Sequence, residues 1–384
     1  MARTPTLKSM LEGLIATPSI SSVDPRYDQG NLKVIQLLAN WLDELGFVCE
    51  ILPLPNHPDK ANLIATLGEG PGGLVLAGHT DTVPYDEGRW KHDPFKLTEH
   101  DNRFYGLGTS DMKSFLALAI EAASMYANKD YKQPLIILAT ADEESSMNGA
   151  RELLRLGKPK ARYAVIGEPT GLKPVRAHKG MMMEAIRVIG HSGHSSDPGL
   201  GNNALDGMHK VIGSILDWRA ELQTKYQNPL FNVAYPSINL GHIHGGDNPN
   251  RICGECELYI DLRPLPGMDI KALQEELQER VNNSLQSTGL NLELRHLMQA
   301  VNPMETAANS PIVQSAEKLT RHTAETAAYS TEAPFLNELG METIILGPGL
   351  IAQAHQPDEF LLLDNIPPML KILQSLIQQF CLTE

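Results

Sequence analysis

The residues best suited to chemistry are imidazoles and carboxylates that stand next to apolar runs of the sequence. They are His79 with Asp81, Asp111, Glu143 with Glu144, Glu168 and, in a late loop, His355. Of these, the two imidazoles and the carboxylates of Asp111, Glu144 and Glu168 suit a pair of borderline metal ions such as zinc, and a shared carboxylate can bridge two metals at about 3.5–4 Å. The set therefore predicts a dinuclear metal centre.

Each of these residues has an ordinary structural explanation when it is taken alone. In Gly78-His79-Thr80-Asp81 the carboxylate can accept the second imidazole N–H and improve the ring as a metal ligand, but a surface histidine beside an aspartate gives the same pattern. An aspartate before a helix, like Asp111, is typical of an N-cap. Consecutive glutamates after a strand are typical of a solvated acidic loop. The joint occurrence of all the motifs favours the metal centre over these separate explanations.

The predicted elements place the motifs at one edge of a sheet. Apolar runs over residues 74–77, 135–139 and 164–166 predict buried strands, and a helical pattern over 112–126 lies between the first two. Strands that alternate with helices indicate an α/β sheet covered on both faces, where ligand sites gather at the strand ends. A helix is also predicted near the start, with Thr4 as its cap and Pro5 in its first position.

A change of pattern after about residue 179 indicates a second domain inserted into the first. It has predicted strands over 181–189, 237–243, 252–262 and 290–294 and predicted helices over 203–222 and 272–285. The α/β pattern returns from Pro311 to the closing helix over 367–380. We therefore predict a discontinuous α/β catalytic domain with a doubly covered mixed sheet, residues 1–180 and 299–384, and an inserted α+β domain, residues 181–298.

Composition limits the class of protein. The 384 residues are 42% hydrophobic and 20% charged, which is ordinary for a globular protein. The formal net charge of −14 argues against nucleic-acid binding. No apolar run reaches the roughly 18 residues of a membrane span, and the first residues lack the apolar core of a signal peptide. We expect a cytoplasmic protein with neither a nucleic-acid nor a membrane partner.

Three further stretches resemble known motifs or loops. Gly190-His191-Ser192-Gly193 lacks the spacing of a serine-hydrolase nucleophile elbow. Cys253 and Cys256 form one C-x-x-C without the second pair of ligands that a structural zinc site needs. The prolines at positions 53, 55 and 58 predict an irregular loop.

Taken together, the motifs resemble those of the M20 family of co-catalytic metallopeptidases and deacylases along essentially the whole chain. The matching stretches are LAGHTDTVP, YGLGTSDMK, LATADEE, IGEPT, RAHKG, GHSGHSS, INLGHIHGGDNPNRIC, DLRPLPGM, STEAPF, LGPG and AHQPDE. The resemblance implies a zinc-exopeptidase-like fold for the catalytic domain. It also implies that the inserted domain is a lid and dimerisation domain.

The resemblance assigns roles to the candidate metal-site residues. It implies that His79 and Glu168 bind one metal, that Glu144 and His355 bind the other and that Asp111 bridges them. It implies further that Asp81 orients His79, that Glu143 is the general base and that the peptide bond Asp111–Met112 is cis.

The remaining roles concern the substrate. The resemblance implies that His194 reaches the active site of the partner subunit, although spacing alone favours an ordinary lid histidine. The residues that it implies for substrate binding are Lys179, Asn239, Arg251, Arg263, Gly347 and Gly349. Glu332 lies in a stretch that resembles a family substrate loop, and we expect it either to bind a substrate ammonium or to cap the following helix.

The implied enzyme is a homodimer that hydrolyses N2-acetyl-L-ornithine to L-ornithine and acetate, a step of arginine biosynthesis, with two Zn²⁺ ions per subunit. Co²⁺ is the expected substitute for zinc, and the resemblance also suggests glutathione. Two alternatives stay open. One is a sibling deacylase that acts on N-succinyl-diaminopimelate or on other N-acyl amino acids. The other is a catalytically silent binding protein, although the intact Glu143 argues against it.

Overall fold

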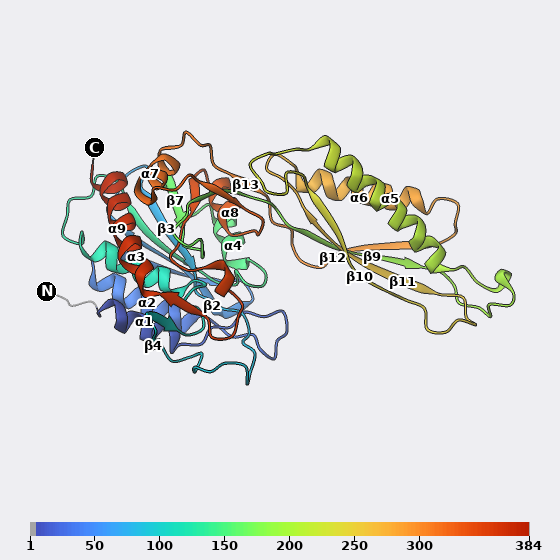
Figure 1. Cartoon of the computed structure of the whole chain (residues 1–384), viewed down its shortest axis with the longest axis horizontal. Coiled ribbons are helices and arrows are strands. Elements are labelled where there is room, and N and C mark those ends of the chain that lie inside the picture. Colours follow the sequence, from blue (N-terminus) through green and yellow to red (C-terminus); the bar gives the residue numbers. More distant parts are fainter. Residues whose placement is uncertain (1–4, 384) are drawn as a thin grey trace. The chain divides into compact units, whose positions relative to one another are not determined.

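The computed structural model describes residues 5–383, and the chain forms two compact units (Figure 1). The second unit comprises Ala177–Glu305 and Thr326–Ser330, and the first unit comprises the rest of the described chain. The long segment 177–305 is therefore inserted into the sequence of the first unit. The short segment 326–330 interrupts the first unit a second time and belongs to the second unit.

The first unit is built on a mixed sheet with the strand order β1-β2-β6-β3-β7-β15-β8. Strand β3 runs parallel to β6 and β7, and β7 runs parallel to β15, whereas β2 runs antiparallel to β6. The strands are β1 (Val48–Leu54), β2 (His57–Leu67), β3 (Leu74–His79), β6 (Leu135–Thr140), β7 (Tyr163–Ile166), β8 (Val175–His178), β14 (Glu325–Ala327) and β15 (Glu342–Ile345). The strands that precede the candidate ligands thus stand side by side.

Helices cover both faces of this sheet, as predicted (Figure 1). Alternate strand residues such as Leu76 and Ile137 join one core with α1, α2, α3, α7 and α9, while α4 and α8 pack together on the other face. The helices are α1 (Leu7–Ile15), α2 (Leu32–Glu44), α3 (Lys113–Ser124), α4 (Asn148–Leu156), α7 (Pro311–Thr320), α8 (Ala333–Glu338) and α9 (Ile366–Ile377). This arrangement confirms the predicted α/β class.

A small antiparallel sheet supports the loops that lie next to the candidate site. Its order is β16-β5-β4, with β4 at Thr98–His100, β5 at Arg103–Tyr105 and β16 at Phe360–Leu362. The loop with Asp111 follows β5, and the loop with His355 precedes β16. Because Phe360 pairs with Tyr105, the two loops start from neighbouring points of the fold.

The hairpin β1–β2 contradicts the predicted irregular loop. Pro53 lies in β1 and Pro58 in β2, and the two strands pair antiparallel with a register shift after Pro53. Strand β1 is the edge of the sheet. Proline is tolerated there because an edge strand leaves part of its N–H groups unpaired in any case.

The first helix also differs in detail from its prediction. α1 begins at Leu7, and the hydroxyl oxygen of Thr6 accepts the N–H of Ser9 at 3.3 Å. Pro5 therefore precedes the N-cap instead of opening the helix. Thr4, the predicted cap, lies outside the described residues.

The second unit is a smaller α+β unit, as the sequence predicts. Its antiparallel sheet has the order β10-β11-β9-β12, and the apolar face of β11 packs with Trp218 of α5 and Leu277 of α6. The elements are β9 (Met182–Ile189), α5 (Ala204–Lys225), β10 (Ser237–Gly245), β11 (Glu255–Arg263), α6 (Ile270–Ser284), β12 (Asn291–His296) and β13 (Met304–Glu305). Among the described residues, no helix combines the length and apolarity that crossing a bilayer requires.

Candidate metal centre

Three parallel strands deliver their following residues to one edge of the large sheet. His79 ends β3, Glu143 and Glu144 follow β6, and Glu168 follows β7. Because β3 is parallel to both β6 and β7, the carboxyl ends of the three strands meet at the same edge. Asp111 comes from the loop between β5 and α3, not from the end of a strand of this sheet.

The two carboxylate oxygens of Asp111 face two different imidazoles. Oδ1 lies 3.2 Å from Nε2 of His79, and Oδ2 lies 3.6 Å from Nε2 of His355. Glu144 completes the second group, since its Oε2 lies 3.1 Å from Nε2 of His355. Asp111 therefore stands between two groups of donor atoms, which is the position that a bridging ligand occupies.

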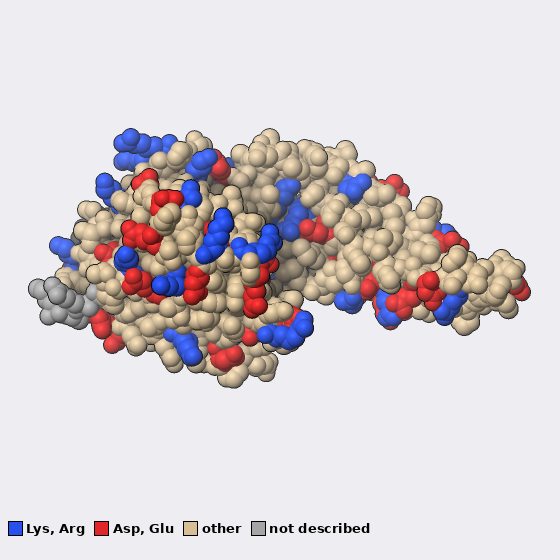
Figure 2. Space-filling view, turned by 60° about the horizontal axis from the view of Figure 1, so that its bottom comes forward, with Lys and Arg blue, Asp and Glu red and all other residues tan. Residues whose placement is uncertain are grey.

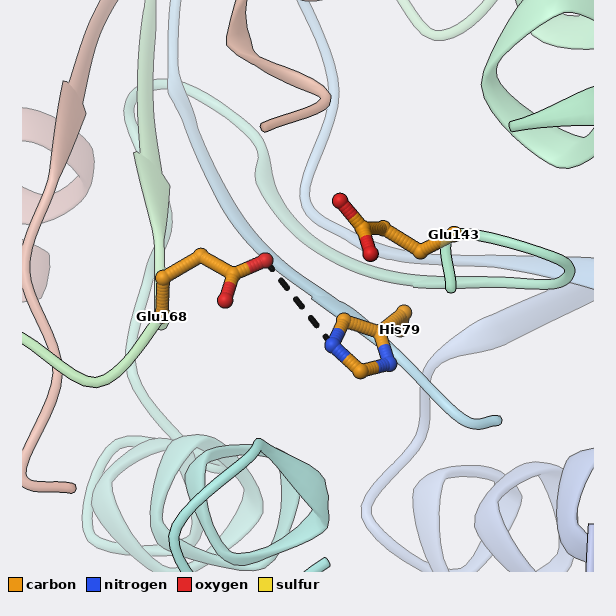
Figure 3. Close-up of side chains that lie close together, drawn as sticks. All are labelled: His79, Glu143 and Glu168. Atoms are coloured by element: carbon orange, nitrogen blue, oxygen red, sulfur yellow. Dashed lines mark ion pairs between the residues drawn. The ribbon is translucent and has the colours of Figure 1, made fainter. Parts of the chain in front are cut away.

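Glu143 and Glu168 also lie close to His79 (Figure 3). Oε1 of Glu168 lies 3.8 Å from Nε2 of His79, and donor atoms of His79, Glu143 and Glu168 lie within 4.8 Å of one another. A second set with the same spacing consists of His79, Asp111 and Glu144. The consecutive residues Glu143 and Glu144 thus belong to different sets.

The Asp81 carboxylate is not the group closest to the His79 imidazole, although the H-x-D spacing suggests that it accepts the imidazole N–H. Nδ1 of His79 lies 2.9 Å from the backbone oxygen of Asp81, and the carboxylate is farther away, at 3.7 Å. That carboxylate instead accepts the backbone N–H groups of Glu143 at 3.3 Å and Glu144 at 3.0 Å. Asp81 therefore orients the imidazole through its carbonyl and fixes the glutamate loop through its side chain.

Burial and like charge make the carboxyl groups of Glu143 and Glu168 hard to ionise. Burial, followed by the charge of Glu168, raises the pKa of Glu143 well above its usual range. Burial, followed by the charge of Asp111, does the same to the pKa of Glu168. By contrast, the hydrogen bond to Glu144 raises the pKa of His355 to about 9. Clustered acidic oxygens with imidazoles are a donor set that suits divalent cations, so the residues fit a metal pair.

Two buried contacts that hold the loops of the site cannot be predicted from the sequence motifs. A buried ion pair joins Nζ of Lys60 to Oδ1 of Asp142 at 2.7 Å, directly before Glu143. The buried carboxylate of Glu359 accepts backbone N–H groups of the loop that contains Asp111. The only sequence signals are a lysine shortly before the apolar residues 63–65 and an acidic residue at the end of the His355 motif. The peptide bond Asp111–Met112 is cis, as expected.

Gly347 and Gly349 pack against ligand-bearing loops. A Cβ atom at position 347 would lie 2.4 Å from the carbonyl oxygen of Glu168, and one at position 349 would lie 2.2 Å from that of Ser110. Only glycine permits such an approach. Both glycines therefore support the backbone beside the ligands, whatever contact they make with a substrate.

Glu332 does not cap the helix that follows it. Its side chain makes no capping hydrogen bond to α8, and its Oε2 accepts the Thr140 hydroxyl at 2.7 Å. Among the described residues, its Oε1 has no hydrogen-bond partner, although the residue is only 3% exposed. Burial raises the pKa of Glu332 to about 7. Of the two roles expected for Glu332, the cap is excluded.

The other candidates belong to the second unit. The backbones of His194 and Arg251 form an isolated β-bridge, and both residues are exposed. Nζ of the buried Lys179 donates to the carbonyl oxygen of Tyr235 at 2.6 Å. The remaining two lie on neighbouring strands, Asn239 exposed on β10 and Arg263 at the end of β11, where it pairs with Asp261 at 3.0 Å.

Comparisons with known proteins agree with this geometry. The profile of "Peptidase family M20/M25/M40" matches residues 75–379. The chain is 51% identical to the acetylornithine deacetylase of Pasteurella multocida, over 99% of this chain and 100% of that one. It is also 51% identical to the acetylornithine deacetylase of Edwardsiella ictaluri, over 98% of both chains. The M20 family metallo-carboxypeptidase Sso-CP2 from Sulfolobus solfataricus has a similar fold, with a TM-score of 0.75 at 20% identity, covering 97% of this chain and 99% of that one.

Proposed function

The chain belongs to peptidase family M20/M25/M40, and on that premise we propose that it hydrolyses N2-acetyl-L-ornithine to L-ornithine and acetate. The observation that supports this most strongly is the 51% identity to an acetylornithine deacetylase along 99% of the chain. The cluster of the buried His79, Asp111 and Glu168 with the half-buried Glu143 and Glu144 supplies the groups that hydrolysis of an amide needs.

We propose two Zn²⁺ ions per subunit, with Co²⁺ as a substitute. His79 and Glu168 would hold one ion, Glu144 and His355 the other, and Asp111 both. The two faces of the Asp111 carboxylate support this division. When bound, the metal pair would lower the pKa of a water molecule and polarise the acyl carbonyl. Glutathione remains a proposal from family resemblance.

Glu143 is proposed as the general base. It would accept a proton from the attacking water and pass that proton to the departing α-amino nitrogen, so that one carboxylate serves both steps. Burial and acidic neighbours raise the pKa of Glu143, which makes its carboxylate a stronger base toward the water proton. Asp81 keeps the Glu143 loop in place through the N–H groups that its carboxylate accepts.

The substrate needs one cation for its carboxylate and one anion for its side-chain ammonium. We propose that Arg263 binds the substrate carboxylate, because a guanidinium can form a bidentate pair of hydrogen bonds with a carboxylate. Lys179, Asn239 and Arg251 are proposed to assist in binding it. We propose Glu332 for the ammonium. Its buried Oε1, which lacks a hydrogen-bond partner in the described chain, supports that role. Gly347 and Gly349 are proposed as further residues that bind the substrate.

The proposed enzyme is a cytoplasmic homodimer. The catalytic domain is residues 1–180 with 299–384, and residues 181–298 form the lid through which the subunits associate. His194 would act in trans on the carbonyl oxygen in the second subunit. Mixing inactive His194→Ala and Glu143→Ala subunits is expected to restore activity in part, because some sites then have both groups. A verified heterodimer without activity would exclude the trans role.

The substrate is tested by measuring acetate and succinate release. Zinc-loaded protein is assayed on N2-acetyl-L-ornithine, N-acetylmethionine and N-succinyl-diaminopimelate, each with and without a chelator. We expect the highest kcat/KM on acetylornithine and loss of activity with chelator. A preference for the succinylated substrate would identify a desuccinylase instead, and no turnover of any substrate would favour the silent binding protein.

A further inference from the structure

Glu359 holds the loop of Asp111 through three backbone N–H groups. Its Oε1 accepts the N–H groups of Ser110 at 2.7 Å and Asp111 at 2.9 Å, and its Oε2 accepts the N–H of Gly108 at 2.9 Å. The backbone adds a further bond, since the N–H of Gly106 donates to the carbonyl oxygen of Glu359 at 3.1 Å. The residue is only 2% exposed.

The loop is shaped so that these N–H groups converge. Gly108 has a φ of +84°, a conformation that residues with a Cβ rarely adopt, and a Cβ there would lie 2.9 Å from Thr82. Successive N–H groups in such a turn form a concave site for an anion, and a carboxylate is a strong acceptor for them. Here the acceptor is a side chain of the same protein, which leaves these N–H groups satisfied in a buried place.

The position of Glu359 in the chain gives this contact a consequence for the metal centre. Glu359 follows His355 by four residues and directly precedes β16, whose Phe360 pairs with Tyr105 of β5. It therefore connects the loop of one candidate ligand, His355, to the loop of another, Asp111. A shift of Asp111 would disturb both metals at once, because its two oxygens face both groups of donors.

We propose that Glu359 is a positioning residue that fixes Asp111 between the two metal ions. It would also hold the His355 loop at a fixed position relative to the Asp111 loop. The inference rests on the proposed dinuclear centre. Glutamine at this position has one acceptor oxygen and a donor NH₂ group, so it cannot serve both the Gly108 N–H and the Ser110 and Asp111 N–H groups. Residues that orient metal ligands commonly change metal affinity by about 10–100-fold when they are altered.

The test is a Zn²⁺ titration of metal-free protein in competition with a chromophoric chelator. Wild-type protein is expected to bind two equivalents. Glu359→Gln is expected to bind both equivalents about 10–100-fold more weakly, while its far-UV circular dichroism stays that of the wild type. The matched control is Asp358→Asn. The Asp358 carboxylate accepts the N–H groups of Lys91 at 2.8 Å and His92 at 3.1 Å, away from the Asp111 loop. Its affinities are expected to stay within about threefold of wild type, a change of less than 1 kcal/mol.

Each outcome decides between the two proposals. Wild-type affinities in Glu359→Gln would overturn the positioning role, and so would equal weakening in Asp358→Asn, because that would indicate a general loss of loop stability. Weakening of one equivalent alone would also overturn it, since Asp111 faces both groups. If wild-type protein never binds two equivalents, the proposed metal pair fails instead. If Glu359→Gln does not fold, Glu359→Asp is titrated, and it is expected to weaken both equivalents because its shorter side chain cannot reach all three N–H groups.

Discussion

The two units of the molecule differ in whether buried charged side chains gather at one edge of a sheet. In the first unit, charged groups lie buried where the strands end, as in the pair Lys60–Asp142 and the carboxylates of Asp81, Glu332 and Glu359. In the second unit, the outer face of the sheet has exposed cross-strand pairs, such as Arg187 with Glu293 at 3.0 Å and Arg295 with Glu257 at 2.7 Å. Acidic and basic side chains are also interspersed on the molecular face shown in Figure 2.

This difference indicates where chemistry is to be expected. Exposed ion pairs are screened by water and salt and add little to stability. Buried carboxylates oppose folding unless a cation or several donors compensate for them. A fold that keeps several of them together at one edge therefore points to a function at that edge, and the outer face of the second unit needs no such explanation.

The largest expected effect tests the buried cluster directly. Glu143→Gln is expected to lower kcat on N2-acetyl-L-ornithine by at least about 10²-fold, because an amide cannot accept the proton of the attacking water. Its zinc content is expected to stay at the wild-type value. Glu293→Gln, an exposed glutamate of the second unit, is the matched control and is expected to keep the wild-type kcat. Loss of zinc in Glu143→Gln, with activity restored by added zinc, would make Glu143 a ligand.

The second test breaks the buried ion pair beside the base. Lys60→Met is expected to lower the free energy of unfolding by about 3 kcal/mol, because it leaves the buried carboxylate of Asp142 without its cation. Urea unfolding measures this change. Lys132→Met is the control, since Lys132 pairs with Asp130 on the surface with side chains 44% and 88% exposed. Equal losses in the free energy of unfolding for the two substitutions would contradict the expectation that a buried ion pair matters more for stability than an exposed one.

The third test concerns Glu332 and substrate choice. Glu332→Gln is expected to lose about 1–3 kcal/mol in kcat/KM on acetylornithine, the range for a hydrogen bond to a charged group, and little on N-acetylmethionine, which has no ammonium. Steady-state kinetics on both substrates measure the difference. Equal losses on the two substrates would mean that Glu332 supports the site without contacting the ammonium.

Glu332 also predicts a dependence of stability on pH in the metal-free protein. Burial raises the pKa of this carboxyl from 4.5 to about 7, so its protonated form stabilises the fold below about pH 4.5 and that contribution is lost as the pH rises to about 7. The Tm of Glu332→Gln, compared with wild type, is therefore expected to improve between pH 5 and pH 8. A constant difference across this range would contradict the buried, proton-binding state of Glu332.

The smallest effect is expected on the exposed face of the second unit. Arg187→Ala removes pairs with Glu255 and Glu293, and its side chain is 38% exposed. We expect a loss of less than about 1 kcal/mol in the free energy of unfolding, and a smaller loss in high salt. Urea unfolding at two salt concentrations checks this. A loss as large as that of Lys60→Met would show that this face is buried in an assembly.

The sequence by itself determined the fold class and the candidate metal ligands. Apolar runs that are followed within a few residues by His79, Glu144 and Glu168 can be recognised locally, because a buried strand needs continuous apolar residues and polar residues begin where it ends. The α+β pattern of the inserted segment is local in the same way. Pro53 and Pro58 misled the prediction because tolerance of proline depends on which neighbours a strand has in the sheet, which the local sequence does not specify: Pro53 lies in the edge strand β1, and Pro58 in the part of β2 that β6 does not pair.

Only the tertiary structure decided which groups hold these ligands in place. Lys60 meets Asp142 across 82 positions of sequence, and Glu359 meets the N–H of Asp111 across 248. The fold likewise decided that the Asp81 side chain serves the glutamate loop while its carbonyl holds His79, and that Glu332 turns away from its helix. The physical reason is that a hydrogen bond is set by distance and direction between atoms, and these follow from packing of remote segments, whereas a side chain's chemical type is already present in the sequence.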